Sequence, residues 1–206
     1  MSRERVRSTA DGRSARNLSD VLPVRLRRLY LQVEDRGRRD LTAETQHREY
    51  AHEDYGILRS LGIAVAREGI PWPMVDSGGR YDFTSIEPLI AAMNEAQILP
   101  IWDLCHYGYP DDLDPFRPDF VGRFAAYCRA AAEYVTARVR GPHFFTPVNE
   151  ITFWGFSGGE CGWAAPFGRD SPRDCASGMC SARLPLPAFA RFARSTAARG
   201  CCTSSR

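Results

Sequence analysis

The chain has 206 residues, of which 44% are hydrophobic and 11% aromatic, a composition typical of a globular protein. No stretch approaches the roughly 18 consecutive apolar residues of a membrane span, so we expect no membrane association. The length suits one domain, but a complete (β/α)8 barrel typically needs about 250 residues. A barrel in this chain would therefore be incomplete.

The formal net charge of +2 is distributed unevenly along the chain. Residues 1–29 hold eight arginines and three acidic residues, which gives +5, and residues 168–206 also carry +5. The middle of the chain, residues 30–167, must therefore carry −8. Because the part with a folded pattern is acidic, the charge argues against a nucleic-acid partner.

Residues 1–28 are rich in Arg and Ser but lack the continuous apolar core of a secretory signal peptide. We therefore expect a basic, disordered leader and a cytoplasmic protein. An organellar transit peptide is the alternative, although Glu4, Asp11 and Asp20 are unusual in such a segment.

The seven cysteines show no zinc-binding spacing, and four of them fall in residues 168–206. Without a signal peptide we expect reduced thiols rather than a disulfide framework. No Gly-rich phosphate loop follows any expected strand, so we expect neither a metal nor another cofactor.

From Leu41 onward helical and strand-like stretches alternate, which predicts an α/β fold with βα units around a parallel sheet. Residues 29–33 are a candidate first strand. Thr42 is expected to cap a helix that runs to about Leu61 and ends at Gly62. A buried strand over residues 63–66 follows, and it ends at a polar segment with two prolines, residues 67–73.

The second half of the pattern repeats this rhythm. Thr84 and Glu87 form a capping-box pattern at the start of a helix that runs to about Ala96, and residues 98–102 give a buried strand. A third helix over residues 118–140 precedes a strand over residues 144–148. About four βα units are therefore present in residues 29–167, the N-terminal half of an incomplete (β/α)8 TIM barrel.

The composition changes abruptly after Phe167. Residues 168–206 contain no Val, Ile, Trp, Tyr, His, Glu, Asn or Gln. We expect an atypical, disordered tail that is read out of frame, because out-of-frame GC-rich codons give an excess of Arg, Ala, Pro, Ser, Gly and Cys. A genuine helix over residues 187–198 is the alternative.

Polar and aromatic side chains follow three consecutive strands, and the carboxyl ends of barrel strands meet at one face, where active sites form. These clusters are Arg67, Glu68 and Trp72; Asp103, His106 and Tyr107; and Asn149, Glu150, Phe153 and Trp154. All four tryptophans lie at or beyond strand ends, which suggests stacking on sugar rings, with packing in the core as the alternative, above all for Trp102.

Four segments resemble the barrel glycoside hydrolases of the large retaining clan, particularly the β-glucosidase-like enzymes of family 1 and their close relatives. They are residues 66–73 (AREGIPWP), 102–108 (WDLCHYG), 147–150 (PVNE) and 162–167 (GWAAPF), and they occur in the family's order. The resemblance covers roughly residues 41–167 and implies hydrolysis of O-glycosidic bonds in carbohydrates.

The resemblance also implies roles for individual residues. Glu150 would be the general acid/base, which requires a carboxyl whose pKa is raised by its surroundings. Asn149 would hydrogen-bond the sugar 2-hydroxyl, His106 would contact sugar hydroxyls, and Arg67 would face the opposite carboxylate. The remaining residues expected to contact substrate are Tyr107, Asp103, Trp154 and Trp163.

Three of these roles have structural alternatives, since Arg67 and Glu68 could form an ion pair, His106 could be a satisfied core histidine and Glu150 could be a solvated charge. The family's nucleophilic carboxylate lies on the seventh strand, which four βα units do not reach, and its polar group on the first strand is not recognisable near Leu29. We therefore expect a truncated hydrolase that is weak or inactive. A non-catalytic carbohydrate-binding or degenerate fragment is the second hypothesis, and a reading frame without a stable product is the third. The oligomeric state is left open.

Overall fold

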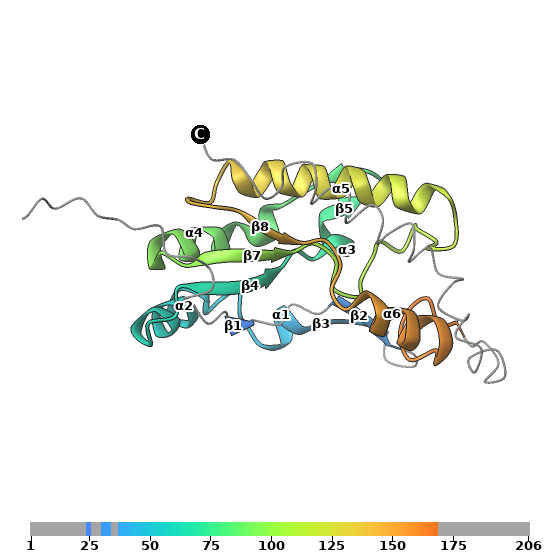
Figure 1. Ribbon diagram of the computed structural model, residues 1–206, viewed down its shortest axis with the longest axis horizontal. Helices are drawn as coiled ribbons and strands as arrows, with labels where there is room; N and C mark the ends of the chain where they lie inside the picture. Colours follow the sequence, from blue (N-terminus) through green and yellow to red (C-terminus); the bar gives the residue numbers. More distant parts are fainter. Residues whose placement is uncertain (1–23, 26–29, 34–36, 169–206) are drawn as a thin grey trace, which may run out of the picture.

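The structure is a computed structural model that describes residues 24–25, 30–33 and 37–168. Its centre is a four-stranded sheet in the order β1, β4, β7, β8, in which all neighbours are parallel. The strands are β1 (Val24–Arg25), β4 (Val65–Gly69), β7 (Leu99–Asp103) and β8 (Phe144–Thr146). Figure 1 shows β4, β7 and β8 side by side with their arrowheads at the same end. The predicted α/β fold, an incomplete barrel of βα units, is confirmed.

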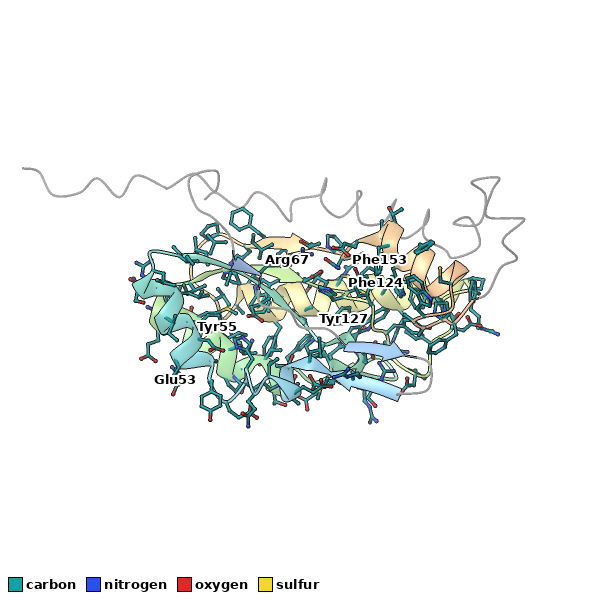
Figure 2. All side chains as sticks on the ribbon, turned by 90° about the horizontal axis from the view of Figure 1, so that it is seen from below. Glu53, Tyr55, Arg67, Phe124, Tyr127 and Phe153 are labelled. Carbon is teal, nitrogen blue, oxygen red and sulfur yellow. The ribbon has the colours of Figure 1, made fainter. Side chains whose placement is uncertain are left out.

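Three longer helices connect these strands, namely α2 (Ala51–Ser60), α4 (Glu87–Ala96) and α5 (Asp119–Thr136). Each is amphipathic, with its buried residues three or four positions apart. In α2, for example, Ala51, Tyr55 and Leu58 are buried. Figure 2 shows Tyr55 of α2 pointing inward while Glu53 of the same helix points outward.

Shorter elements occupy the connections. Two antiparallel hairpins pair β2 (Tyr30–Val33) with β3 (Gly37–Asp40), and β5 (Asp76–Ser77) with β6 (Arg80–Tyr81). The short helices are α1 (Leu41–Glu44), α3 (Trp72–Val75), the 3-10 turn η2 (Thr84–Ile86), α6 (Ile151–Trp154) and the π-helical turn η3 (Gly155–Glu160). Within the described ranges no helix is long and apolar enough to cross a membrane.

The two faces of the sheet differ in burial, because successive side chains of a strand point to opposite faces. On β7, Pro100 and Trp102 are buried, whereas Leu99 and Ile101 are only partly buried. Arg67 of β4 is paired in register with Ile101, so the two share the half-buried face. That face corresponds to the interior of a barrel, which side chains fill when the barrel is closed.

Several predicted elements need correction. Residues 30–33 form a strand, but it belongs to the β2–β3 hairpin, and the strand that pairs with β4 is β1, which lies inside the predicted leader. The helix predicted from Thr42 is divided into α1 and α2, and Asp40 caps α1 through hydrogen bonds to the N–H groups of Thr42 and Ala43. The other residues of the predicted leader, and the tail beyond Gly168, lie outside the described residues.

The boundaries of later elements also shift. The buried strand predicted over residues 63–66 runs from Val65 to Gly69, so Arg67 and Glu68 are part of it rather than beyond it. The predicted capping box does not form. Instead, Asp82 accepts hydrogen bonds from the backbone N–H and hydroxyl of Thr84. The helix that follows ends at Ala96 as predicted, and Gln97 closes it with a left-handed backbone.

Candidate active site

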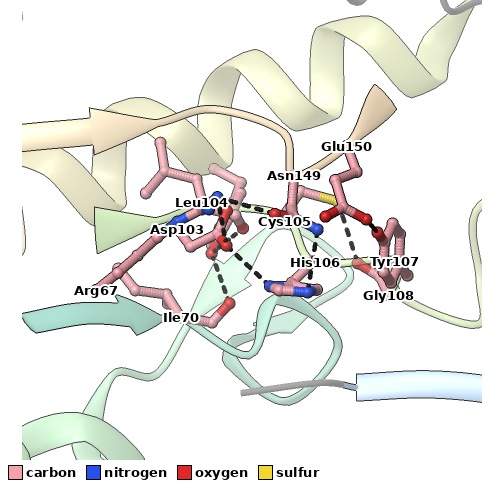
Figure 3. A network of polar contacts seen from close by, with 11 residues as sticks. Arg67, Ile70, Asp103, Leu104, Cys105, His106, Tyr107, Gly108, Asn149 and Glu150 are labelled. Atoms are coloured by element: carbon pink, nitrogen blue, oxygen red, sulfur yellow. Dashed lines mark hydrogen bonds and ion pairs between the residues drawn. The ribbon is translucent and has the colours of Figure 1, made fainter. Parts of the chain in front are cut away.

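Arg67, Asp103 and Asn149 come together because three parallel strands end beside one another. Gly69, the last residue of β4, pairs in register with Asp103, the last residue of β7, which pairs in turn with Thr146 at the end of β8. Asn149 and Glu150 follow three residues later and are tied to the neighbouring strand end, since the N–H of Asn149 donates to the carbonyl of Cys105 at 2.8 Å. The predicted convergence on one side of the strand ends is visible in Figure 3.

Four of the predicted site residues form a closed ring of polar contacts. Nη2 of Arg67 lies 2.9 Å from Oδ2 of Asp103 and donates to Oδ1 of Asn149 at 3.0 Å. The same Oδ2 of Asp103 lies 2.8 Å from Nδ1 of His106, and Nε2 of His106 lies 3.1 Å from Nδ2 of Asn149. Asp103, His106 and Asn149 are buried, and Arg67 is partly buried.

The ring admits one consistent assignment of donors and acceptors. An ionised carboxylate only accepts, so His106 donates from Nδ1 to Asp103, and its Nε2 then accepts from the amide NH₂ of Asn149. This leaves Oδ1 of Asn149 to accept from Arg67, as its distance requires. With His106 neutral, the ring carries one positive and one negative charge, which compensates the burial of both.

The candidate acid/base, Glu150, lies beside this ring. Its side chain is exposed, and the hydroxyl of Tyr107 donates a hydrogen bond to Oε2. Tyr107 itself packs edge-on against His106, with ring centroids 4.9 Å apart. The structure therefore brings Glu150, Tyr107, His106 and Asn149 into one connected group (Figure 3).

The two tryptophans expected to contact substrate, Trp154 and Trp163, lie in different surroundings. Trp154 is buried, packs against Tyr109 and donates from its indole N–H to the carbonyl of Ala165 at 2.9 Å, so its ring offers no open face for a sugar. Trp163 is 58% exposed and meets Phe156 edge to face. Phe153, also exposed, packs against Tyr107 with ring centroids 5.8 Å apart.

Trp72 and Trp102 are both buried, which agrees with the alternative of core packing. Trp72 stacks on Tyr127 of α5 at 5.1 Å between centroids, and its indole N–H donates to Asp76. The sequence marks Trp102 above all for core packing, but it does not separate Trp72 from Trp163, because both lie near strand ends.

The suggested ion pair between Arg67 and Glu68 is wrong. Consecutive residues of a strand point to opposite faces, so Glu68 faces α2 while Arg67 faces the ring. Glu68 is fully buried, accepts a hydrogen bond from the hydroxyl of Tyr55 at 2.9 Å, and lies 3.1 Å from Nε2 of His47. No local pattern around His47 in the sequence marks this contact with a residue 21 positions away.

A metal centre and a thiol nucleophile each place requirements on the described residues around the site. Among the described residues, no cluster of three or more His, Cys, Asp or Glu side chains is arranged to hold an ion. Cys105, which precedes His106 in the sequence, is buried, and burial raises the pKa of its thiol well above the usual range. A thiol that stays protonated is a poor metal ligand and a poor nucleophile.

These features define an incomplete (β/α) barrel whose strand ends carry a connected polar and acidic site. No protein-family model matches the chain, and no curated protein sequence matches it. Solved structures match it clearly, however. A family 1 β-glucosidase from Thermotoga maritima is similar over 73% of this chain and 34% of its own, with 23% identity and a TM-score of 0.60.

A psychrophilic β-glucosidase from Micrococcus antarcticus is similar over 74% of this chain and 32% of its own, with 22% identity and a TM-score of 0.58. The Thermotoga maritima β-glucosidase in complex with castanospermine shares 24% identity and has a TM-score of 0.57. The chain therefore spans about a third of the length of these enzymes. At such identities the likeness concerns the fold, which is that of the N-terminal portion of a β-glucosidase-like barrel.

Proposed function

We propose that the described part of the chain forms the acid/base half of a retaining β-glucosidase-like site, which acts on O-glycosidic bonds in carbohydrates. One observation carries this proposal. Asn149 and Glu150 follow β8 directly beside His106 of the β7 end and Arg67 of β4 (Figure 3). Asn149 is hydrogen-bonded to both of these residues, and Glu150 accepts a hydrogen bond from Tyr107, whose ring packs against His106. The β-glucosidase-like fold supports the same assignment.

The proposed chemistry uses Glu150 in two steps. It first protonates the glycosidic oxygen as the bond to the aglycone breaks, and it then takes a proton from the water that attacks the sugar. Because the Glu150 side chain is exposed, a substrate and a water molecule have access to it. The hydrogen bond from Tyr107 limits the orientations of its carboxyl group.

A retaining mechanism also requires a nucleophilic carboxylate about 5 Å from the acid/base. The resemblance places that group on a seventh barrel strand, whereas the described part of the chain has four parallel strands. We therefore propose that this chain binds sugars and by itself has no more than trace hydrolytic activity, since acid/base help alone contributes roughly 10²–10⁴-fold.

The test measures binding and hydrolysis separately. Isofagomine lactam, present in a complex of the Thermotoga maritima enzyme, is titrated into the chain by calorimetry. We expect saturable binding that Glu150→Gln weakens and that Glu133→Gln, at an exposed position in α5, leaves unchanged. If the chain hydrolyses glucosides at all, Glu150→Gln should lower the hydrolysis rate of methyl β-glucoside more than that of nitrophenyl β-glucoside. The reason is that a nitrophenolate needs little protonation to leave. Absence of binding, or equal binding by all three proteins, would contradict the proposal.

The second candidate is a non-catalytic carbohydrate-binding fragment, favoured by the exposed aromatic rings beside the site. Phe153 is 47% exposed and Trp163 is 58% exposed, and flat rings of this kind stack on sugar faces. If Trp163→Ala abolishes binding of the lactam while Glu150→Gln does not change it, this second function is supported.

A further inference from the structure

Asp103 is the acidic residue of the polar ring and directly contacts two of its three other members, Arg67 and His106. It is 2% exposed and stands at the end of β7. Its Oδ2 atom is 2.9 Å from Nη2 of Arg67 and 2.8 Å from Nδ1 of His106. That oxygen is therefore engaged by two protein donors. The other oxygen, Oδ1, has no hydrogen-bond partner among the described residues but is buried, so neither oxygen is accessible to a sugar hydroxyl.

The contact with Asp103 determines where the neutral His106 ring carries its proton. With the proton on Nδ1, the ring donates to Asp103 and its Nε2 accepts from the Asn149 amide. With the proton on Nε2, the lone pair of Nδ1 would face a carboxylate and the Nε2–H would face an N–H of Asn149. Both contacts would then be repulsive, so the carboxylate of Asp103 selects the Nδ1–H form.

This choice is passed on to Asn149. Because Nε2 of His106 accepts, the NH₂ group of Asn149 must face it, and the amide oxygen is turned to Nη2 of Arg67 at 3.0 Å. Asp103 also faces the guanidinium of Arg67 directly, so it balances the positive charge of Arg67. The resemblance implies that Arg67 also faces the carboxylate on the opposite side of the site. One carboxylate thus orients three side chains from three strand ends.

The backbone keeps Asp103 in this position. The N–H of Ile70 donates to the Asp103 carbonyl at 2.9 Å, and the N–H of the next residue, Leu104, donates to the carbonyl of Thr146 at 2.9 Å. The end of β7 is therefore joined to both neighbouring strand ends at the residue that carries the carboxylate (Figure 3).

We infer that Asp103 is a positioning residue of the site and not a sugar ligand: it holds His106 as the Nδ1–H tautomer and thereby orients Asn149 and Arg67 toward the substrate. This inference rests on the proposed function, because only that function implies a sugar substrate at the site. The tautomer and its dependence on Asp103 follow from the contacts of the ring alone.

The test reads the tautomer directly, by long-range ¹⁵N–¹H correlation NMR of the histidine side chains in the complete chain. A His106→Gln variant identifies the His106 signals among the four histidines. We expect wild-type His106 to show a protonated Nδ1 and an unprotonated Nε2. In Asp103→Asn, which keeps the size of the side chain but loses its charge, we expect a mixture of both tautomers.

Asp76→Asn provides the matched control, because Asp76 is also buried and pairs with Arg123 at 2.6 Å and with the indole N–H of Trp72 rather than with His106. It removes a similar buried ion pair but should leave the His106 signals unchanged. For isofagomine lactam, we expect Asp103→Asn to weaken binding about tenfold, the factor for roughly one hydrogen bond lost when His106 and Asn149 are no longer held in one orientation. Asp76→Asn should have a much smaller effect.

Three results would overturn the inference: a wild-type His106 protonated on Nε2, an Asp103→Asn spectrum identical to that of the wild type, or equal changes in Asp103→Asn and Asp76→Asn. Failure of the proposed function gives a different result. In that case the wild type would not bind the lactam, while the His106 tautomer would still be Nδ1–H and would still change in Asp103→Asn.

Discussion

The hydroxyl of Tyr107 donates a hydrogen bond to the carboxylate of Glu150, and both residues have positive φ angles, +64° and +42°. Left-handed backbone costs a residue with a side chain roughly 1–2 kcal/mol, and it concentrates at functional sites. The strained conformations place these two side chains opposite each other at neighbouring strand ends. The arrangement is thus held by the fold at an energetic cost.

Glu150→Gly is therefore expected to be more stable than Glu150→Ala by about 1 kcal/mol, although glycine is normally the more destabilising residue. Both variants lose the carboxylate and its hydrogen bond, so their difference reports the backbone alone. The free energy of unfolding is measured in urea. At the exposed helical residue Thr152 the order should reverse, with Gly less stable than Ala by roughly 1 kcal/mol. The same order of stability for the Gly and Ala variants at both positions would contradict backbone strain at Glu150.

A second pair of variants tests the close packing of Gly141, in the segment after α5, against Leu99 at the start of β7. Gly141 has a φ of +101°, and a Cβ placed there would lie 2.9 Å from Cδ2 of Leu99. We expect Gly141→Ala to lose about 1–3 kcal/mol of stability through backbone strain and this overlap.

Gly56 provides the control, since it lies in the middle of α2 with nothing within 4 Å of an added Cβ. Gly56→Ala should gain up to about 1 kcal/mol from helix propensity. Thermal unfolding of both variants is sufficient to distinguish them. A stable Gly141→Ala protein would show that the close approach to Leu99 is relieved at little cost.

The buried carboxylate of Glu68 gives a third prediction. Tyr55 is fully buried and donates to Glu68, so Tyr55→Phe removes a hydrogen bond from a charged group inside the protein. We expect a loss of about 1.5–3 kcal/mol. Tyr134 donates to Glu87 at 2.7 Å in an exposed contact, and Tyr134→Phe should lose less than about 1 kcal/mol. Equal losses from the two hydroxyls would mean that Glu68 does not depend on Tyr55.

The general position of the site could be predicted from the sequence because parallel βα units bring strand ends together wherever their exact boundaries lie. The structure places Arg67, His106 and Glu150 near these strand ends, and their roles stay predictions. The pairing partners of the site residues could not be predicted, because they depend on which face of a strand each residue occupies. A strand predicted to end at Ala66 leaves Glu68 in the same cluster as Arg67, whereas the observed strand through Gly69 places them on opposite faces.

The burial of tryptophans could not be predicted either. Trp154 and Trp163 are nine residues apart beyond the same strand, and both follow polar site residues. The η3 turn lies between them, and one ring is directed inward toward Ala165 while the other is exposed. A π-helical turn adds a residue to the helical period, so side-chain directions beyond it do not follow from spacing.

The last prediction concerns the dependence of stability on pH near β8. Burial lowers the pKa of His143, which directly precedes this strand, and its Nδ1 atom is buried without a hydrogen-bond partner among the described residues. In the unfolded chain this histidine titrates near its usual value of about 6.5. As the pH falls through that value, the unfolded state takes up the proton before the folded state does, so unfolding becomes more favourable. The stability contributed by His143 is therefore present above the unfolded pKa and is lost below it, until the folded form is protonated as well.

We expect the wild type to lose more stability between pH 7.5 and about pH 5 than His143→Gln, which has no group to titrate there. The control is Ser60→Ala, at an exposed position without a group that titrates in this range, and it should follow the wild-type curve. Denaturant unfolding at a series of pH values gives the comparison, and parallel curves for the wild type and His143→Gln would show that burial does not disfavour the charged form of this residue.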